Sequence, residues 1–547
     1  MGNKGLKAGK ASAEPLTMNG AEQDRDAQAP DVLSLAKAVS CHLKGDSEAA
    51  LKELDEAVRN GGSAEVHAGR AQLLVELKQY REAFQSFAKV LEYRPRDPRT
   101  CLNLGLCLQN LARHAEALEY FQKALETRPE WLEPRLSIGV SLLHLKKYPE
   151  AISAFEDCLT SHADCEAAWF GKAVALQLLW RFDEARSAYE QILRQNPAAE
   201  ESLLNMISLG LQQKDYDLLR KCSQQLLEAH PNHPVALEGL AAAAFASGNA
   251  DAAQTFCVKL TQLAPNVFDH WYNLGVAYQR QGNVNDAVQA YIRARNIRPD
   301  VAHSYVQLGG LYQEIGDLGN ARDSFEQAIA HAPDRVDLKY QLAWIIEQQG
   351  DLENAERLYS EIGDSNPDLE DAQFRLGYLK LRRDDFRGAS EAFQSCLQKR
   401  PDWREAELNL AMSYWKLTQY SAAQEELQKL LEREPNSVDA LRGLAAIALD
   451  RDDTAKALQY HLRLQQLGDR TAEVLYNTAL LSQKSGKMED AVSLYRAALS
   501  EKPDFPEALL NLGHALKELG REEEARSCWI PAISAKPELA AGYFQQS

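Results

Sequence analysis

Small, apolar and aromatic residues recur along the chain at an interval of 34 residues. When the intervals are numbered from residue 64, position 20 is alanine in thirteen of fourteen intervals, and position 8 is glycine or alanine in thirteen. Position 24 is aromatic in ten of them. A large ring opposite a small residue allows two helices to pack closely at native density. Each interval therefore predicts a helix, a short turn and a second helix.

Prolines and glycines mark the ends of these predicted helices. Proline occupies position 32 in twelve intervals, from Pro95 to Pro537. It ends the second helix, because it lacks the backbone N–H and clashes with the preceding turn. Glycine at position 15 suits a left-handed cap after the first helix. The glycines at this position are Gly248, Gly282, Gly316, Gly350, Gly486 and Gly520.

The pattern resembles the tetratricopeptide repeat (TPR) family, whose 34-residue motif has conserved small, aromatic and proline positions. One unit nearly reproduces the motif, with Trp271, Leu274, Gly275, Tyr278, Ala287, Tyr291, Ala294 and Pro299. Fourteen units keep one register from residue 64 to 539, and a fifteenth precedes them one residue out of phase. The resemblance implies an all-α, right-handed superhelical solenoid of about fifteen helix-turn-helix repeats. It also implies a concave groove, lined mainly by the first helix of each repeat.

This register leaves little of the chain outside the repeats. We expect a TPR solenoid over residues 31–539, a disordered N-terminal arm over residues 1–30, and a partial C-terminal cap over residues 540–547. No catalytic domain fits in the remainder, and the sequence contains no phosphate-binding loop, zinc-protease motif or nucleophile elbow. His230 and His233 form an HxxH sequence across a turn, which we interpret as a solvated turn. We therefore predict no enzyme activity, no cofactor and no metal.

Composition narrows the classes of partner. The 547 residues carry a net charge of −18, which opposes both nucleic acid and anionic membranes. No apolar stretch approaches the roughly 18 residues of a membrane-spanning helix. The nine cysteines contain no CxxC pair, and no secretory signal is recognisable. We expect a cytoplasmic protein that binds neither nucleic acid nor membranes.

Positions 2, 6, 9 and 13 share one face of the first helix, because they are spaced by four, three and four residues. A row of carboxamides on this face can pair with the peptide groups of an extended chain. The row resembles the asparagine ladder in the repeat arm of O-linked N-acetylglucosamine transferases. The other interpretation is that asparagine is tolerated at an exposed position. Position 6 holds Asn103, Asn205, Asn273, Asn409, Asn477 and Asn511.

Three further residues complete the predicted peptide-binding groove. Arg375 occupies position 6 in its own repeat. Trp344 and Trp415 lie at positions 9 and 12, which are unusual places for tryptophan in the motif. Across the four rows there are six bases against fourteen acids, a net charge of −8, and five of the bases follow residue 279. The groove should therefore prefer neutral or basic segments, although acids at position 2 also suit a helix N-terminus.

One repeat departs from the packing pattern. The unit at residues 200–233 has Ile207 at position 8, Gly210 at position 11, Leu219 at position 20 and Ser223 at position 24. We expect altered local geometry there, forming a joint between the two halves of the chain.

The sequence thus predicts a non-enzymatic scaffold that binds extended or helical segments of partner proteins in its groove. One alternative is a regulatory, substrate-binding arm of a glycosyltransferase-like system acting in trans. Another is a self-assembling array of repeats, which leaves homo-oligomer formation open.

Overall fold

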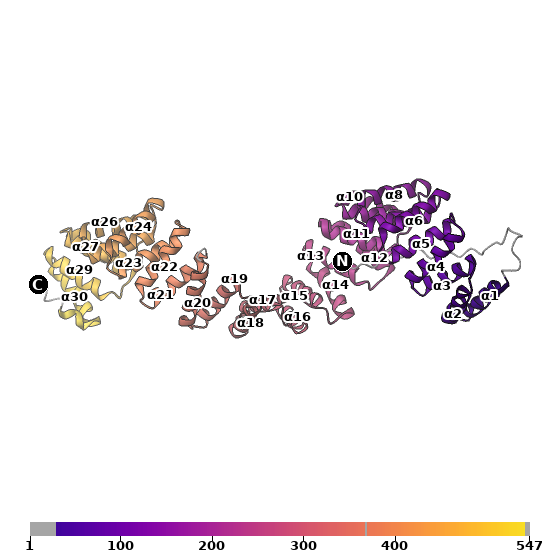
Figure 1. Ribbon diagram of the computed structural model, residues 1–547. Helices are drawn as coiled ribbons and strands as arrows, with labels where there is room; N and C mark the ends of the chain where they lie inside the picture. The colour runs from indigo at the N-terminus through magenta and orange to yellow at the C-terminus, as the bar shows by residue number, and fades with distance from the viewer. Residues whose placement is uncertain (1–28, 367–368, 542–547) are drawn as a thin grey trace. The chain divides into compact units, whose positions relative to one another are not determined.

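The computed structural model describes residues 29–366 and 369–541, and every regular element within them is a helix. Figure 1 shows these helices in chain order. They belong to two compact units, the first ending at Ile297 and the second beginning at Arg298. Of the arm expected over residues 1–30, residues 1–28 lie outside the described residues, and residues 29–30 instead begin α1. Of the cap expected over residues 540–547, residues 542–547 lie outside them.

The helices of the first unit are α1 (Ala29–Leu43), α2 (Ser47–Arg59), α3 (Ala64–Glu76), α4 (Tyr80–Tyr93), α5 (Pro98–Asn110), α6 (His114–Thr127), α7 (Leu132–His144), α8 (Tyr148–Ser161), α9 (Glu166–Leu178), α10 (Phe182–Gln195), α11 (Glu200–Gln213), α12 (Tyr216–Ala229), α13 (Pro234–Ala246), α14 (Ala250–Leu263), α15 (Phe268–Arg280) and α16 (Val284–Ile297).

The helices of the second unit are α17 (Ala302–Glu314), α18 (Leu318–His331), α19 (Val336–Gln348), α20 (Leu352–Ser365), α21 (Glu370–Arg382), α22 (Phe386–Lys399), α23 (Arg404–Lys416), α24 (Tyr420–Arg433), α25 (Val438–Asp450), α26 (Thr454–Gln466), α27 (Ala472–Lys484), α28 (Met488–Glu501), α29 (Pro506–Glu518) and α30 (Glu522–Ala535), followed by the 3₁₀ helix η1 (Pro537–Leu539).

These bounds follow the 34-residue register. The first helix of a repeat covers positions 1–13 and the second covers positions 17–30, with α11 one residue longer and α26 one residue shorter. Within each unit, successive helices pack against one another as antiparallel pairs. The prediction of an all-α fold built from helix-turn-helix repeats is therefore confirmed.

The contact between position 8 and position 24 holds the two helices of a repeat together. Phe155 shows it most clearly, because its buried ring lies between two glycines. A Cβ atom on Gly139, in the same repeat, would lie 2.5 Å from the ring, and one on Gly171, in the next repeat, 2.3 Å from it. A side chain at either glycine would overlap the ring. The ring therefore joins helices within a repeat and between neighbouring repeats.

Tyrosines at position 24 place a polar group in this core, and each finds a partner. Their hydroxyls donate to the side chain at position 12 of the same repeat, which is glutamine in three cases and glutamate in one. Burial raises the pKa of all four hydroxyls, which therefore remain donors. The pairs are Tyr189–Gln177 at 3.1 Å, Tyr291–Gln279 at 3.0 Å, Tyr359–Glu347 at 3.1 Å and Tyr495–Gln483 at 2.9 Å.

The turn between the two helices is left-handed in all fourteen repeats, not only in the six with glycine at position 15. Eight repeats place another residue there, with φ between 54° and 62°. This conformation is least favourable for a β-branched residue such as Thr418. The packing of the two helices therefore fixes the turn, and glycine is only its least strained occupant. The eight residues are Lys78, Ala112, Lys146, Trp180, Lys214, Asp384, Thr418 and Asp452.

The unusual repeat at residues 200–233 keeps its helices close by a different contact. Leu219 is completely buried, and a Cβ atom on Gly210 would lie 3.2 Å from its backbone nitrogen. The small residue has thus moved from position 8 to position 11. The boundary between the two compact units lies after Ile297, outside this repeat.

Two adjacent glycines in α17 give a direct test of the position 8 contact. Gly309, at position 8, would place a Cβ atom 2.9 Å from the Phe325 ring, whereas a Cβ atom on Gly310 would meet nothing within 4 Å. Gly310→Ala should raise the free energy of unfolding by about 1 kcal/mol, because alanine favours a helix. Gly309→Ala should lower it by about 1 kcal/mol, because overpacking outweighs that gain. Denaturant titration of the two variants checks this, and equal shifts would contradict the role of position 8.

Candidate functional site

The asparagines at position 6 have mostly unused side chains. Asn273 is exposed and the other five are half-buried. Asn511 donates a hydrogen bond from Nδ2 to the Tyr476 hydroxyl at 2.9 Å. The side chains of the other five have no hydrogen-bond partner among the residues that the structure describes. Their carboxamides are therefore free to pair with a ligand.

Two hollows open on this face in the second unit. The first has a volume of about 620 Å³ and lies between α17 and α19. The second, of about 370 Å³, lies between α25 and α27 and reaches His461 on α26. The first is lined by Val306, Gly310, Gln313, Glu314, Phe325, Asp337, Leu338, Gln341 and Trp344. The second is lined by Arg442, Ala445, Ala446, Leu449, His461, Leu464, Thr471, Glu473, Val474 and Asn477.

Both hollows use the same places in the repeat. Each is lined by positions 5, 9, 12 and 24 of one repeat and by positions 2, 3 and 6 of the next. Position 9 is small in both, as Gly310 and Ala446. Because Gly310 and Ala446 line the two hollows, a small residue at position 9 leaves room between consecutive first helices. The sequence analysis missed Gly310 and His461, although a small residue at position 9 was a visible signal.

The predicted tryptophans have different roles. Trp344 lines the first hollow together with Gln341, at position 6 of the same helix. Trp415 instead donates a hydrogen bond from Nε1 to Asp450 at 2.7 Å, and the Lys416 ammonium lies 5.3 Å from its ring centre. The structure thus places Trp344 in a hollow with other groove residues, and Trp415 in a contact with the next repeat.

Arg375 neutralises a buried carboxylate. Its Nη1 lies 3.3 Å from Oε1 of Glu347, whose side chain is only 6% exposed. The other carboxylate oxygen of Glu347 accepts the Tyr359 hydroxyl. Glutamate at position 12 therefore carries a charge where the other tyrosine repeats have neutral glutamine, and Arg375 balances it. This pairing accounts for arginine in the asparagine row.

Half of the acids at position 2 are in ion pairs with bases outside the four groove rows. In the first unit one of four is paired, and in the second unit four of six. The pairs are Glu65–Arg94, Asp337–Arg335, Asp439–Arg404, Glu473–Lys502 and Glu507–Lys536. Within the described residues, Glu133, Glu201, Asp269, Asp371 and Glu405 have no such partner. The sum of −8, counted over positions 2, 6, 9 and 13, ignores these bases, so it overstates the net negative charge on this face of the second unit.

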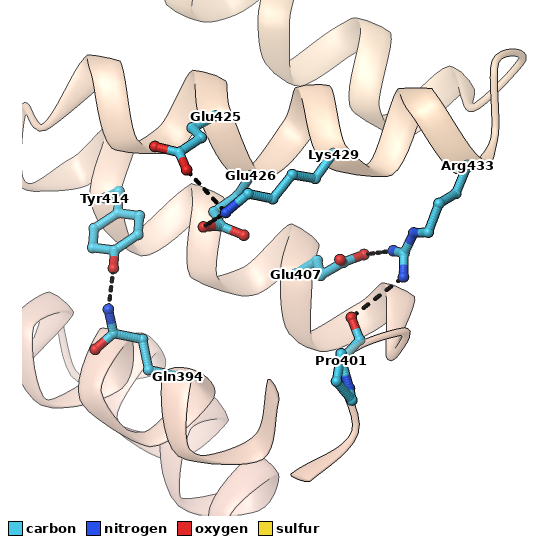
Figure 2. Close-up of polar contacts among 8 residues, drawn as sticks. All are labelled: Gln394, Pro401, Glu407, Tyr414, Glu425, Glu426, Lys429 and Arg433. Carbon is cyan, nitrogen blue, oxygen red and sulfur yellow. Dashed lines mark hydrogen bonds and ion pairs between the residues drawn. The ribbon is translucent and has the colours of Figure 1, made fainter. Parts of the chain in front are cut away.

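A polar cluster around α23 and α24 joins neighbouring repeats (Figure 2). Glu407 is 4% exposed and takes position 4, where the motif has tryptophan. Burial raises its pKa, and the ion pair with Arg433 opposes that shift. Arg433 also donates to the Pro401 carbonyl, 3.3 Å away, in the preceding repeat. The buried carboxyl of Glu407 therefore positions Arg433, which contacts the preceding repeat.

Figure 2 also shows two contacts beside this pair. Lys429 lies 3.0 Å from both Glu425 and Glu426, and Gln394 of α22 donates to the Tyr414 hydroxyl of α23. The second contact again crosses from one repeat to the next.

Other chemistry-bearing residues have packing or surface roles. Nε2 of His230 and of His233 each lie 3.5 Å from a carboxylate oxygen of Glu200, a neighbour that the sequence did not reveal. Across residues 29–366 and 369–541 there is no group of three or more His, Cys, Asp or Glu side chains arranged to hold a metal ion. Burial raises the pKa of Cys107 and Cys257 to about 12, which makes them poor nucleophiles at neutral pH. No helix in the described part of the chain is long and apolar enough to cross a membrane.

Family models agree with this repeat geometry. Models for the tetratricopeptide repeat match residues 266–334, 313–376, 371–402, 408–470 and 483–540. The chain is a TPR protein. Such repeats generally serve as scaffolds for protein interaction, and that general role applies to this TPR protein. Models for subunit 3 of the anaphase-promoting complex and for the coatomer epsilon subunit match residues 79–158 and 140–245.

Solved structures similar to the TPR protein cover part of its length. MamA is 24% identical over 31% of this chain and 94% of its own, with a TM-score of 0.29. YrrB, described as a TPR protein with an unusual peptide-binding site, is 19% identical over 34% and 96%, with a TM-score of 0.31. A TPR protein from Parabacteroides merdae is 17% identical over 46% and 98%, with a TM-score of 0.32. No curated protein sequence matches the chain significantly.

The Glu347 site allows the role of Arg375 to be tested by a double-mutant cycle. Arg375→Asn should lower the free energy of unfolding by about 2 kcal/mol, because it leaves a buried carboxylate without its counter-charge. Adding Glu347→Gln should recover most of that loss, since glutamine already accepts a tyrosine hydroxyl in three other repeats. Denaturant titration of both single variants and the double variant measures the coupling. Simple additivity would show that the two residues act independently.

Proposed function

We propose that the TPR protein is a non-enzymatic scaffold whose second unit binds a segment of a partner protein along the first-helix face. The observation that carries the proposal is the pair of hollows at equivalent repeat positions. Each hollow has a position 6 carboxamide on its wall, Gln341 in the first and Asn477 in the second. A bound segment can thus place side chains in the hollows while carboxamides pair with its peptide groups.

The two hollows suit a segment longer than one repeat. They lie four repeats apart in the same unit, with Asn409 at position 6 between them. Asn409 and Asn477 are available to a ligand without breaking a hydrogen bond, whereas Asn511 must first release Tyr476. The proposal therefore assigns Asn409 and Asn477 to the binding surface, and treats Asn511 as a residue that is already paired.

The first hollow suits a basic side chain. Glu314 on its rim has no ion-pair partner among the described residues, and the Trp344 ring lines the wall beside it. A lysine or arginine can lie over an indole face and gain a cation–π interaction. Asp337 adds less to this field, because Arg335 already holds it at 2.5 Å. These features support the expected preference for neutral or basic segments.

A cytoplasmic location is part of the proposal. Six of the nine cysteines are buried as free thiols in the repeat cores. Unpaired thiols in packing positions suit a reducing compartment.

Filling the first hollow separates binding from folding. Gly310→Leu should leave the thermal midpoint unchanged or higher, because the space at Gly310 is open and leucine favours a helix. It should lower the affinity for dodecapeptides selected on the unmodified full-length chain by about tenfold or more, since the leucine side chain occupies the hollow. Fluorescence anisotropy measures the affinity. Gly319→Leu, on α18 with only Asp317 within 4 Å of its Cβ position, is the matched control. Full affinity in Gly310→Leu would exclude this hollow from binding.

Charge at the same hollow should affect affinity in a salt-dependent way. A selected peptide carrying lysine at the position that enters the hollow should bind several-fold more tightly than its glutamate version at low salt. The difference should shrink as the screening length falls to about 8 Å. Glu314→Gln should reduce it, whereas Glu353→Gln, an exposed acid on α20, should not. Equal affinities at every salt concentration would remove electrostatic preference from the account.

A further inference from the structure

The second hollow is lined by a histidine whose ring nitrogens form no hydrogen bond within the described part of the chain. His461 is 4% exposed, and neither Nδ1 nor Nε2 has a hydrogen-bond partner among the described residues. It occupies position 24, which holds an aromatic ring in ten other repeats. Burying an imidazole without partners costs stability. Packing alone would thus favour phenylalanine here, as in five other repeats.

The described residues around His461 do not supply a hydrogen-bond partner for its ring nitrogens. Tyrosines at position 24 bond to a polar side chain at position 12, but here position 12 is Leu449. Asp469, the acid whose charge acts on His461, is held by Arg442 at 2.9 Å and by the Thr471 hydroxyl at 3.2 Å. His461 is one of the residues that line the hollow, and both of its ring nitrogens are buried without a hydrogen-bond partner among the described residues.

The charges around this hollow are balanced, so its unused groups are neutral. Arg442 on α25 pairs with Asp469, and Glu473 on α27 lies 3.7 Å from Lys502. Burial lowers the pKa of His461 and Asp469 opposes that shift, so the ring is neutral at pH 7.5. A neutral imidazole has one nitrogen that donates and one that accepts. The carboxamide of Asn477, on the same wall, is also without a partner in the described part of the chain.

We propose that this hollow is a specificity subsite for a glutamine or asparagine side chain of the bound partner segment. A carboxamide both donates and accepts, which matches the unused groups of His461 and Asn477. A carboxylate or an ammonium group would lose its hydration without finding a free counter-charge. An aliphatic side chain would leave the imidazole unsatisfied. The inference rests on the proposed binding function, and it adds the chemistry of one recognised residue.

The test uses the full-length chain and a displayed library of random dodecapeptides. Selected sequences should carry glutamine or asparagine at one fixed position. In synthetic versions, changing that residue to leucine or to glutamate should weaken binding by about tenfold at pH 7.5, the scale of losing a buried hydrogen-bond partner. These comparisons need no protein variant.

His461→Phe gives the complementary result. It should raise the thermal midpoint, because phenylalanine fills the same position elsewhere without an unpaired polar group. It should also weaken the glutamine peptide about tenfold, bringing it level with the leucine version. Because burial lowers the pKa of His461, the ring becomes protonated only at a pH below the ordinary histidine range. Protonation there removes the ring acceptor, so the glutamine peptide should bind more weakly and the glutamate peptide more tightly.

The outcomes separate this subsite from the general function. Peptides that respond to Gly310→Leu but not to His461→Phe would overturn the glutamine subsite and leave groove binding intact. Tighter binding of the leucine or glutamate version at pH 7.5 would overturn it as well. Selection that yields no peptide, or only peptides indifferent to both Gly310→Leu and His461→Phe, would reject the proposed function and the subsite with it.

Discussion

The packing of a ring at position 24 against a small residue at position 8 is the contact on which the rest of the structure depends. It brings the two helices of most repeats together, and it joins one repeat to the next. Phe155, between Gly139 and Gly171, shows the packing within a repeat and between repeats in one residue. Because the core uses these positions, the groove side of the first helix remains free to vary. The hollows at Gly310 and Ala446 are consequences of that freedom.

The repeat fold was predictable because its signal is periodic. Each helix boundary follows from the spacing of the alanine, the small residue and the proline, and fourteen repetitions of one pattern remove ambiguity. Positions 2, 6 and 9, which share one face of the first helix because of its 3.6-residue turn, are all represented on the walls of the two hollows. Trp344 and Asn477 accordingly lie in the two hollows.

The details of the site depend on partners about one repeat away in sequence, which a pattern within one repeat does not show. Arg375 balances Glu347, 28 residues earlier, and Trp415 bonds to Asp450, 35 residues later. Glu473 and Glu507 are paired with lysines 29 residues further along. The sequence predicts that these residues lie on helices, but side-chain pairing within and between repeats determines which of them have unpaired polar groups. The signals that do mark the hollows are exceptions to the pattern, namely a small residue at position 9 and histidine at position 24.

The central claim is that the stability of a repeat depends on its core positions, whereas partner binding depends on other positions, those that line the hollows. A saturation substitution scan of the full-length chain, read out both by thermal midpoint and by binding of one selected peptide, tests it most directly. The account predicts that changes at Gly310, Gln341, Ala446 and Asn477 on the walls of the hollows alter affinity at a nearly constant midpoint. Changes at positions 8, 20 and 24 should lower the midpoint and affinity together, His461 excepted. If groove substitutions lowered the midpoint as much as core substitutions do, that separation would be contradicted.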